Sequence, residues 1–261
     1  MQLCWLVIEY YNDKAHRQAE RRPCAATGYK SVAVTERNNG MKILVVCEYS
    51  GRTRDAFIRA GFDAMSCDLL ATEVPGPHYQ GDCRDILDAE EWGLLIAHPD
   101  CTYLTCSAEW AYGDGPYHQK VKPETLVGAA RREARVQALD FVRLLLNSRA
   151  KRKCLENPAV GAINKAIRRP DQIIQPNQFG HDASKATGLW LENLPLLVPT
   201  RHIPPRMVNG RPRWANQTDS GQNKLTPGPD RWKERARTYE GWSDAMADQW
   251  GRFLRHTRED L

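Results

Sequence analysis

The stretch Leu94-Leu95-Ile96-Ala97-His98-Pro99-Asp100-Cys101-Thr102 decides the fold of this chain and locates its chemistry. Four apolar residues bounded by turn residues are typical of a strand buried on both faces, and such strands belong to parallel sheets. Pro99 ends the predicted strand, so Cys101 falls just beyond its carboxyl end, where open α/β sheets bind ligands. Cys101 is therefore a candidate nucleophile, although a free cysteine is also commonly a small apolar residue under a loop.

Strands and helices alternate on both sides of this stretch. The pattern predicts strands over 42–47, 62–68 and 153–156, and helices after Gly51, over 129–146 and over 242–254. This alternation is typical of a doubly wound, mostly parallel α/β sheet. The helix over 129–146 is amphipathic, and we place Ala130 and Ala134 on its buried face and Arg131 on its exposed face.

The composition is that of a globular protein. Of the 261 residues, 41% are hydrophobic and 26% are charged, and no apolar run approaches the roughly 18 residues that a membrane span needs. The eight cysteines form no C-x-x-C pair, which favours reduced cysteines over a disulfide framework. His98, Cys101, Cys106 and His118 match no common zinc spacing, so we expect no metal. We expect a cytoplasmic protein that does not bind membranes.

Positive charge is concentrated late in the chain. The net charge is +5, and the segment 199–238 holds nine Lys and Arg against three Asp and Glu. A basic stretch of this kind suits a polyanion such as nucleic acid, although it is also compatible with a solvated surface that has no partner. The candidates for phosphate contacts are Arg201, Arg206, Arg211 and Arg213.

Acidic residues follow three successive predicted strands. Glu48 precedes the turn Ser50-Gly51 and a helix, Asp68 ends the next strand, and Asp82 follows a third. A carboxylate about 20 residues after such a turn is placed to meet ribose hydroxyls. A single glycine makes a weak phosphate cradle, so this rim suits a cofactor without phosphate, such as S-adenosylmethionine. The alternative is that each acid caps a helix.

A second pair of motifs follows two other predicted strands. Cys101 follows one strand, and Glu156-Asn157-Pro158 ends the other. A thiolate is a nucleophile, and a carboxylic acid beside it can hydrogen-bond to a ring nitrogen and protonate it. That pair is what attack on C6 of a pyrimidine requires. The alternative is that Glu156 is an ordinary surface or capping acid.

With these motifs, the chain resembles the DNA (cytosine-5) methyltransferases, in particular the short forms found in phage-like sequences. The resemblance covers residues 41–251 in order. The matching segments are Glu48-Tyr49-Ser50-Gly51, Asp68, Gly81-Asp82, Pro99-Asp100-Cys101, Glu156-Asn157-Pro158, and the stretches 175–181, 185–191 and 245–251.

The resemblance implies a Rossmann-like methyltransferase fold and methyl transfer from S-adenosylmethionine to C5 of cytosine in DNA. Cys101 would attack C6 of a flipped-out base, and Glu156 would hold its N3 edge. The implied cofactor-binding residues are Glu48, Ser50, Gly51, Asp68, Asp82 and Pro99. The implied substrate-binding residues are Asn157, Pro158, Gln175, Lys185 and the four arginines named above. We expect a monomer whose macromolecular partner is DNA.

The chain departs from the family at several points. Asp100 stands where the family has proline, and a carboxylate there disfavours the thiolate. No Gln-x-Arg-x-Arg pattern occurs at Gln175, so the arginine expected near the pyrimidine oxygen is missing. These departures leave two alternatives open: a catalytically degenerate nucleic-acid-binding protein of this fold, or the same chemistry on RNA or a nucleotide.

The resemblance and the composition together divide the chain into four segments. Residues 1–40 form an irregular extension, with Met41 as the candidate natural start. An extra N-terminal element is the alternative for this segment. Residues 41–198 form the methyltransferase core. Residues 199–238 form a basic, Pro- and Gly-rich connection in place of a large target-recognition domain. Residues 239–261 contain a closing helix that packs on the core.

Overall fold

A computed structural model describes residues 40–121, 123, 125–228 and 231–257. The predictions for residues 1–39 and for the last four residues of the chain lie outside this range. No helix in the described ranges is long and apolar enough to cross a bilayer.

The central element is a seven-stranded sheet in the order β3-β2-β1-β4-β5-β7-β6. The strands are β1 (Lys42–Val46), β2 (Asp63–Asp68), β3 (His78–Gln80), β4 (Trp92–Ala97), β5 (Lys153–Pro158), β6 (Gln172–Ile174) and β7 (Thr187–Glu192). All neighbouring pairs are parallel except those that β7 makes with β5 and β6. The prediction of a doubly wound, mostly parallel α/β sheet is confirmed.

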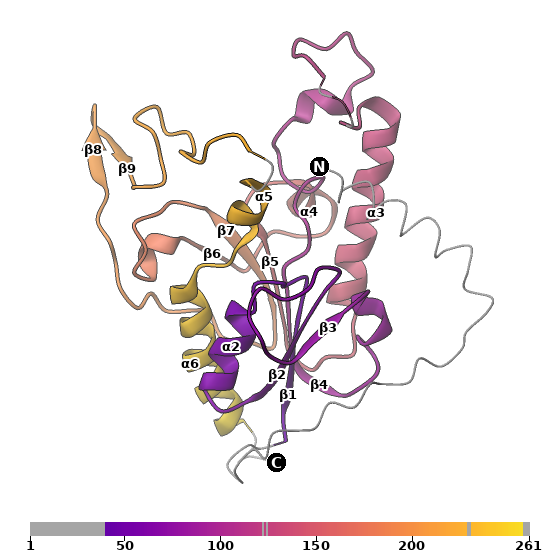
Figure 1. The fold of residues 1–261 in the computed structure, drawn as a ribbon, viewed down its shortest axis with the longest axis vertical. Coiled ribbons are helices and arrows are strands. Elements are labelled where there is room, and N and C mark those ends of the chain that lie inside the picture. Colours follow the sequence, from indigo (N-terminus) through magenta and orange to yellow (C-terminus); the bar gives the residue numbers. More distant parts are fainter. Residues whose placement is uncertain (1–39, 122, 124, 229–230, 258–261) are drawn as a thin grey trace, which may run out of the picture.

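Helices cover both faces of the sheet (Figure 1). On one face lie α2 (Arg52–Arg59) and α6 (Glu240–His256), and on the other α3 (Gly128–Leu146) and the short α4 (Ala162–Ala166). Every residue of β4 is buried, as expected for a strand covered on both faces. Side chains alternate between two cores, so Ile96 packs toward α6 while Leu95 packs toward α3.

The predicted face of the long helix is wrong at two positions. Ala130 is exposed, whereas Arg131 is 6% exposed. The Arg131 guanidinium lies 5.3 Å from the ring centre of Tyr103 and 4.8 Å from that of Tyr112. A buried arginine is tolerated here because the aromatic faces attract its charge and its stem packs as an apolar group.

The basic connection is more ordered than the sequence indicates. It contains the hairpin β8 (Arg206–Val208) and β9 (Arg211–Arg213), and the short helix α5 (Arg231–Ala236). Asn209 and Gly210 form the hairpin turn, both at positive φ (48° and 72°), as a two-residue turn of this kind requires. The hairpin projects away from the main sheet (Figure 1). Closing the fold, α6 buries Ala245, Met246 and Trp250, as predicted.

Candidate active site

The register between β4 and β5 sets the geometry of the candidate site. Ala97 pairs with Leu155, so His98 comes beside Glu156 one residue further along both strands. His98 also extends the β4 ladder, donating its backbone N–H to the Val46 carbonyl oxygen at 3.0 Å. The two side chains meet: Nδ1 of His98 lies 2.6 Å from Oε2 of Glu156, and each side chain is about one-tenth exposed.

A second hydrogen bond joins the two motifs. The side-chain amide of buried Asn157 donates to the Pro99 carbonyl oxygen at 2.8 Å. Asn157 and Pro99 are therefore used to hold the loop after β4 against the end of β5. Because the loop is held there, Cys101 and Glu156 lie at the same edge of the sheet.

Cys101 lies in a turn stabilised by its own neighbours. Its carbonyl oxygen accepts the amides of Leu104 and Thr105, each at 3.0 Å. The Asp100 carboxylate accepts the Thr102 amide at 3.0 Å and the Thr102 hydroxyl at 2.8 Å. Cys101 as a residue is exposed. The prediction of an accessible thiol at a strand end therefore fits this turn better than the alternative of a cysteine packed under a loop.

Charges near the thiol act in both directions. Partial burial of the sulfur and the Asp100 carboxylate raise the pKa of Cys101, and the charges of Lys185 and Arg235 oppose this. The sequence predicts the effect of Asp100 correctly, although burial contributes more. Glu156 also raises the pKa of Cys101, so the two groups share one electrostatic environment.

Glu156 and His98 form a hydrogen-bonded pair in which each group favours the charged form of the other. Burial alone would raise the pKa of Glu156, but Lys185 and the hydrogen bond from His98 outweigh it, and this pKa is lowered. Burial alone would lower the pKa of His98, but Glu156 outweighs it, and this pKa is raised. We conclude that Glu156 is ionised at neutral pH. An ionised carboxylate accepts hydrogen bonds but cannot itself protonate a ring nitrogen.

The turn after β1 is held by Glu48. This buried carboxylate accepts the backbone amides of Thr53 at 2.7 Å and Arg54 at 3.2 Å, and the Ser50 hydroxyl lies 3.4 Å from it. Glu48 thus occupies the amino end of α2, the capping role that was the alternative to cofactor binding. Gly51 has a φ of +73°, and a Cβ there would lie 2.4 Å from the guanidinium of buried Arg54.

The other two acids of the rim also accept backbone amides. Asp82 accepts the Arg84 amide at 3.0 Å and is buried. Asp68 accepts the Leu70 amide at 2.9 Å and is partly exposed at the end of β2. Burial raises the pKa of Asp68 to about 6, opposed by the Leu70 hydrogen bond and assisted by the Glu48 charge. Of the three acids, Asp68 is the one whose side chain is partly accessible, whereas Glu48 and Asp82 are buried.

Some of the residues predicted to bind the substrate hold the local backbone in place, and one of them acts on the candidate site through its charge. Gln175 accepts the Lys185 backbone amide at 2.9 Å and so orders the segment that carries this lysine. The Lys185 ammonium lies 5.7 Å from the ring centre of Trp242 and lowers the pKa of Glu156. Pro158 ends β5 opposite Thr187. Lys185 is therefore the one of these side chains whose charge reaches the site.

The four predicted arginines also differ from one another. Arg206 forms an ion pair with Asp219 at 2.6 Å, and Arg213 donates to the Asp219 carbonyl oxygen at 3.0 Å, so both stabilise the hairpin. Arg201 and Arg211 are exposed, and their side chains make no hydrogen bond or ion pair with another residue in the described part of the chain. These two remain the better candidates for contacts with an anion.

Sequence reasoning missed the contribution of α5. The Tyr49 hydroxyl donates to the Lys233 carbonyl oxygen at 3.0 Å, and Arg237 forms an ion pair with Glu73 at 2.7 Å. These contacts hold α5 near the β1 turn, and they bring the Arg235 charge within reach of Cys101. The high density of arginine and lysine in this short helix was the available signal.

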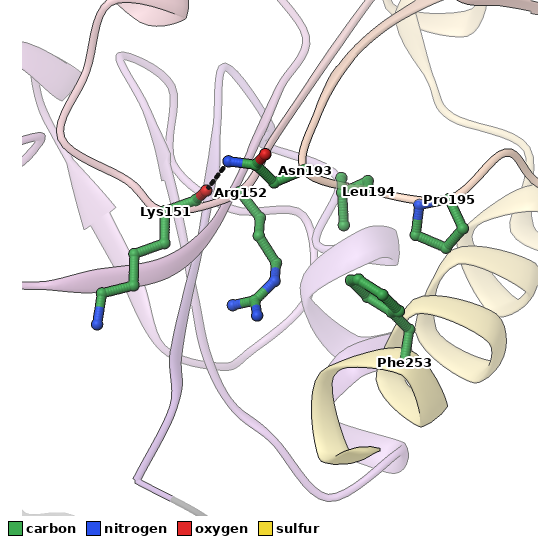
Figure 2. Close-up of a pocket in the computed structure, with 6 residues that line it drawn as sticks. All are labelled: Lys151, Arg152, Asn193, Leu194, Pro195 and Phe253. Atoms are coloured by element: carbon green, nitrogen blue, oxygen red, sulfur yellow. Dashed lines mark hydrogen bonds between the residues drawn. The ribbon is translucent and has the colours of Figure 1, made fainter. Parts of the chain in front are cut away.

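Two cavities lie outside the β4–β5 motif, by which we mean residues 98–101 after β4 together with Glu156 and Asn157 in β5. One, of about 600 Å³, is lined by Lys151, Arg152, Asn193, Leu194, Pro195 and Phe253 (Figure 2). It lies before β5 and after β7, at the opposite edge of the sheet from Cys101. The other, of about 620 Å³, borders Ser50 and Arg52 and runs along α2 and α6, with side chains of both charges. In the described ranges, no group of three His, Cys, Asp or Glu residues could hold a metal ion.

No protein-family model and no curated protein sequence matches this chain. Among solved structures, the chain is similar to a crystal structure of a "putative DNA modification methyltransferase" encoded within a prophage of E. coli. The two are 14% identical, with a TM-score of 0.40, and the match covers 65% of this chain. The chain spans about half of that protein's length, at 53%. No residue role follows from a likeness of this extent.

Proposed function

We propose that this protein transfers a methyl group from S-adenosylmethionine to C5 of cytosine in DNA. One observation carries the proposal: two hydrogen bonds join the loop that contains Cys101, after β4, to the end of β5, which contains Glu156. One bond runs from His98 to Glu156, and the other from Asn157 to Pro99. These bonds hold a thiol and a carboxylate at one edge of the sheet, which is the arrangement that addition to a pyrimidine requires.

The chain's own groups account for the covalent step. The Cys101 thiol gives its proton to solvent, and the sulfur of the resulting thiolate forms a bond to C6. The C5–C6 π pair moves onto the ring, and the negative charge is shared by C5, N3 and O2 until C5 takes up the methyl group. Lys185 and Arg235 favour the thiolate, and Asp100 opposes it. Glu156, being ionised, accepts a hydrogen bond from the 4-amino group and orients the ring.

Bound S-adenosylmethionine would supply an electrophilic methyl group, which C5 takes up. Solvent then takes the C5 proton, the electron pair of that C–H bond re-forms the C5–C6 double bond, and the Cys101 sulfur leaves as the thiolate. The residues of the rim fit this cofactor at two points. Asp68 offers a partly accessible carboxylate for ribose hydroxyls. The cavity beside Ser50 carries both charges, as a zwitterionic amino-acid group requires. Gly51 does not add to the fit, because the Arg54 guanidinium fills the space beside it.

The proposed DNA contacts lie on the basic segment. The exposed Arg201 and Arg211 would bind phosphates, which positions the protein without reading the sequence. A two-stranded antiparallel ribbon such as β8–β9 has a width that fits a DNA groove. In a duplex, C6 of cytosine is stacked, so the target base has to be flipped out to reach Cys101.

Transfer of a radiolabelled methyl group to duplex DNA tests the proposal. The wild-type protein should label DNA, and mapping of modified cytosines should place the label at C5. Cys101→Ser should lower the rate at least about 1,000-fold because the hydroxyl is a much weaker nucleophile here. Cys106→Ser, which changes another exposed cysteine of the same loop, should leave the rate unchanged. Equal labelling by Cys101→Ser and wild type would refute the assigned nucleophile.

A second candidate function follows from the raised pKa of Cys101. A thiol that remains protonated at neutral pH would leave a nucleic-acid-binding protein without catalysis. Salt-dependent DNA binding combined with no cofactor binding and no label transfer would favour this second function. Transfer of the labelled methyl group to RNA or to a free nucleotide, but not to DNA, would instead show that the substrate is not DNA.

A further inference from the structure

In the proposed reaction, the hydrogen bond from His98 to Glu156 joins the loop after β4 to the end of β5, but no step yet gives His98 a role of its own. Its Nδ1 lies 2.6 Å from Glu156 Oε2, and its side chain is nine-tenths buried. Its Nε2 is one of six buried side-chain atoms in the described chain that have no hydrogen-bond partner. A histidine buried for structure alone normally satisfies both ring nitrogens. His98 satisfies only the nitrogen that faces Glu156.

The pair uses only one oxygen of Glu156. Oε2 is engaged by His98, whereas Oε1 accepts no hydrogen bond from any residue within the described ranges. His98 therefore fixes both the orientation of the carboxylate and which of its oxygens remains available. The other charged groups that act on His98 are Glu48, from the end of β1, and Lys185.

We propose that His98 is a positioning residue that keeps Glu156 ionised and aims its free oxygen, and that it thereby makes the site select amino-pyrimidines over keto-pyrimidines. The proposal rests on the proposed function. Cytosine presents an N–H donor at C4, which an ionised carboxylate accepts. Uracil and thymine present an oxygen at C4, which the same carboxylate repels because two acceptors then face each other.

This role takes the place of the arginine that the resemblance predicts near the pyrimidine and that the chain lacks. A protonated imidazole supplies a donor and a positive charge beside the carboxylate, as a guanidinium would. Unlike a guanidinium, it can lose its proton within the physiological range. Selection of cytosine should then depend on pH in a way that an arginine-based site would not.

Two variants separate the effect of the His98 charge from the effect of its packing. His98→Gln retains a hydrogen-bond donor but not the charge, and His98→Phe removes both. The control is His256→Gln, which changes an exposed histidine in the last turn of α6. The substrates are matched duplexes with one target cytosine or one target uracil, and the measured quantity is the ratio of the two values of kcat/KM.

We expect His98→Gln to lower the cytosine-to-uracil ratio about 10- to 100-fold. The uncharged glutamine leaves Lys185 as the one positive charge among the described residues that opposes the effect of burial on Glu156, so a larger fraction of Glu156 is protonated and donates to the uracil oxygen instead of repelling it. Selectivity should also be lost at low pH, where Glu156 becomes protonated. We expect this loss to begin at a higher pH in His98→Gln than in the wild type, because the His98 charge no longer lowers the pKa of Glu156. His256→Gln should change neither quantity. An unchanged ratio and pH profile in His98→Gln, with cytosine activity present, would overturn the proposal.

A measurement on the wild-type protein alone keeps the test independent of variant folding and of activity. In protein labelled with ¹⁵N at histidine and ¹³C at glutamate side chains, we expect NMR at pH 7 to show both His98 nitrogens protonated and Glu156 ionised. A neutral His98 at pH 7 would overturn the proposal even if the protein methylates cytosine. Absence of cytosine methylation together with an intact charged pair would refute the proposed function instead.

Discussion

The two halves of the sheet's carboxyl edge treat their acidic residues differently. After β1 and β3, Glu48 and Asp82 are buried and accept backbone amides from the helices that follow them. At the end of β5, Glu156 bonds to a side chain and keeps one oxygen free. An acid at a strand end therefore indicates a site only if helix amides have not already taken up its oxygens. By this criterion, the β4–β5 half holds the candidate reactive groups, and Glu48 and Asp82 in the β1–β3 half support the fold.

Among variants at the two halves of this edge, Glu156→Ala should have the largest effect on stability. Removing the carboxylate leaves the His98 charge buried without a partner, and we expect a loss of about 3–5 kcal/mol in the free energy of unfolding. Urea denaturation measures this loss. Arg59→Ala, which breaks an exposed ion pair with Asp244, should cost less than about 1 kcal/mol. Similar losses for the two variants would contradict a charged His98–Glu156 pair.

The same pair predicts how stability depends on pH. Because the folded pKa of Glu156 is lowered, its contribution is complete above the unfolded value of about 4.3 and is lost as the pH falls through the folded value. Because the folded pKa of His98 is raised, its contribution is lost as the pH rises through that value. Wild-type stability measured against pH should show both losses. The Glu156→Ala profile should instead lose stability as the pH falls below about 6.5, because His98 without its partner would then have to carry a buried charge.

A smaller effect should follow from Glu48→Gln in the other half of the edge. The amide accepts at only one oxygen, so one of the two α2 amides loses its partner, at a cost of about 1–2 kcal/mol. Thermal unfolding measures this. Cofactor affinity, measured by calorimetry, should change less than about threefold. A large loss of cofactor affinity with unchanged stability would contradict the capping role and would indicate that Glu48 contacts the cofactor directly.

Asp68→Asn should have an effect of opposite sign. The folded pKa of Asp68, about 6, lies above its ordinary value of 3.8, so its stability contribution is greatest at low pH and is lost as the pH rises through 6. The amide of the variant cannot ionise, and we expect a gain of about 1 kcal/mol at pH 7.5 that disappears below about pH 4. If Asp68 binds ribose, cofactor affinity should fall about tenfold. Lower stability at pH 7.5 would contradict this account.

The smallest effect should come from Asp100→Asn. Removing the carboxylate lowers the pKa of Cys101, and we expect iodoacetamide to alkylate this thiol a few-fold faster at pH 7.5. Peptide mass spectrometry measures the rate at Cys101 against that at Cys106 in the same sample. Asp182→Asn, which changes an exposed acid in another segment, should leave the ratio unchanged. An unaltered rate in Asp100→Asn would show that the Asp100 carboxylate does not control the reactivity of Cys101.

The sequence predicts the central strands and the main helices well, because their patterns come from burial. Every residue of β4 is buried, and Gly61 follows α2 at a φ of +86°, as a helix-ending glycine does. The reversed direction of β7 could not be predicted, since a strand buried on both faces has the same apolar pattern in either direction. The short strands β3 and β6 have three residues each, too few for a pattern.

The candidate site could be predicted in its residues but not in its contacts. Cys101 and Glu156 follow from their positions after strands. The His98–Glu156 bond depends on the register that pairs Ala97 with Leu155, and no local pattern fixes a register between strands over fifty residues apart. The ion pair of Arg206 with Asp219 likewise depends on the fold of the basic segment.

Covalent trapping on DNA tests the central claim most directly. In a duplex whose target cytosine carries fluorine at C5, the C5 proton is replaced by an atom that cannot leave as a cation, so the sulfur–C6 bond persists after methyl transfer. We predict that, with S-adenosylmethionine present, mass spectrometry will find one nucleotide attached at Cys101, and none in Cys101→Ser. Absence of the adduct under conditions in which the protein binds both DNA and cofactor would contradict the account.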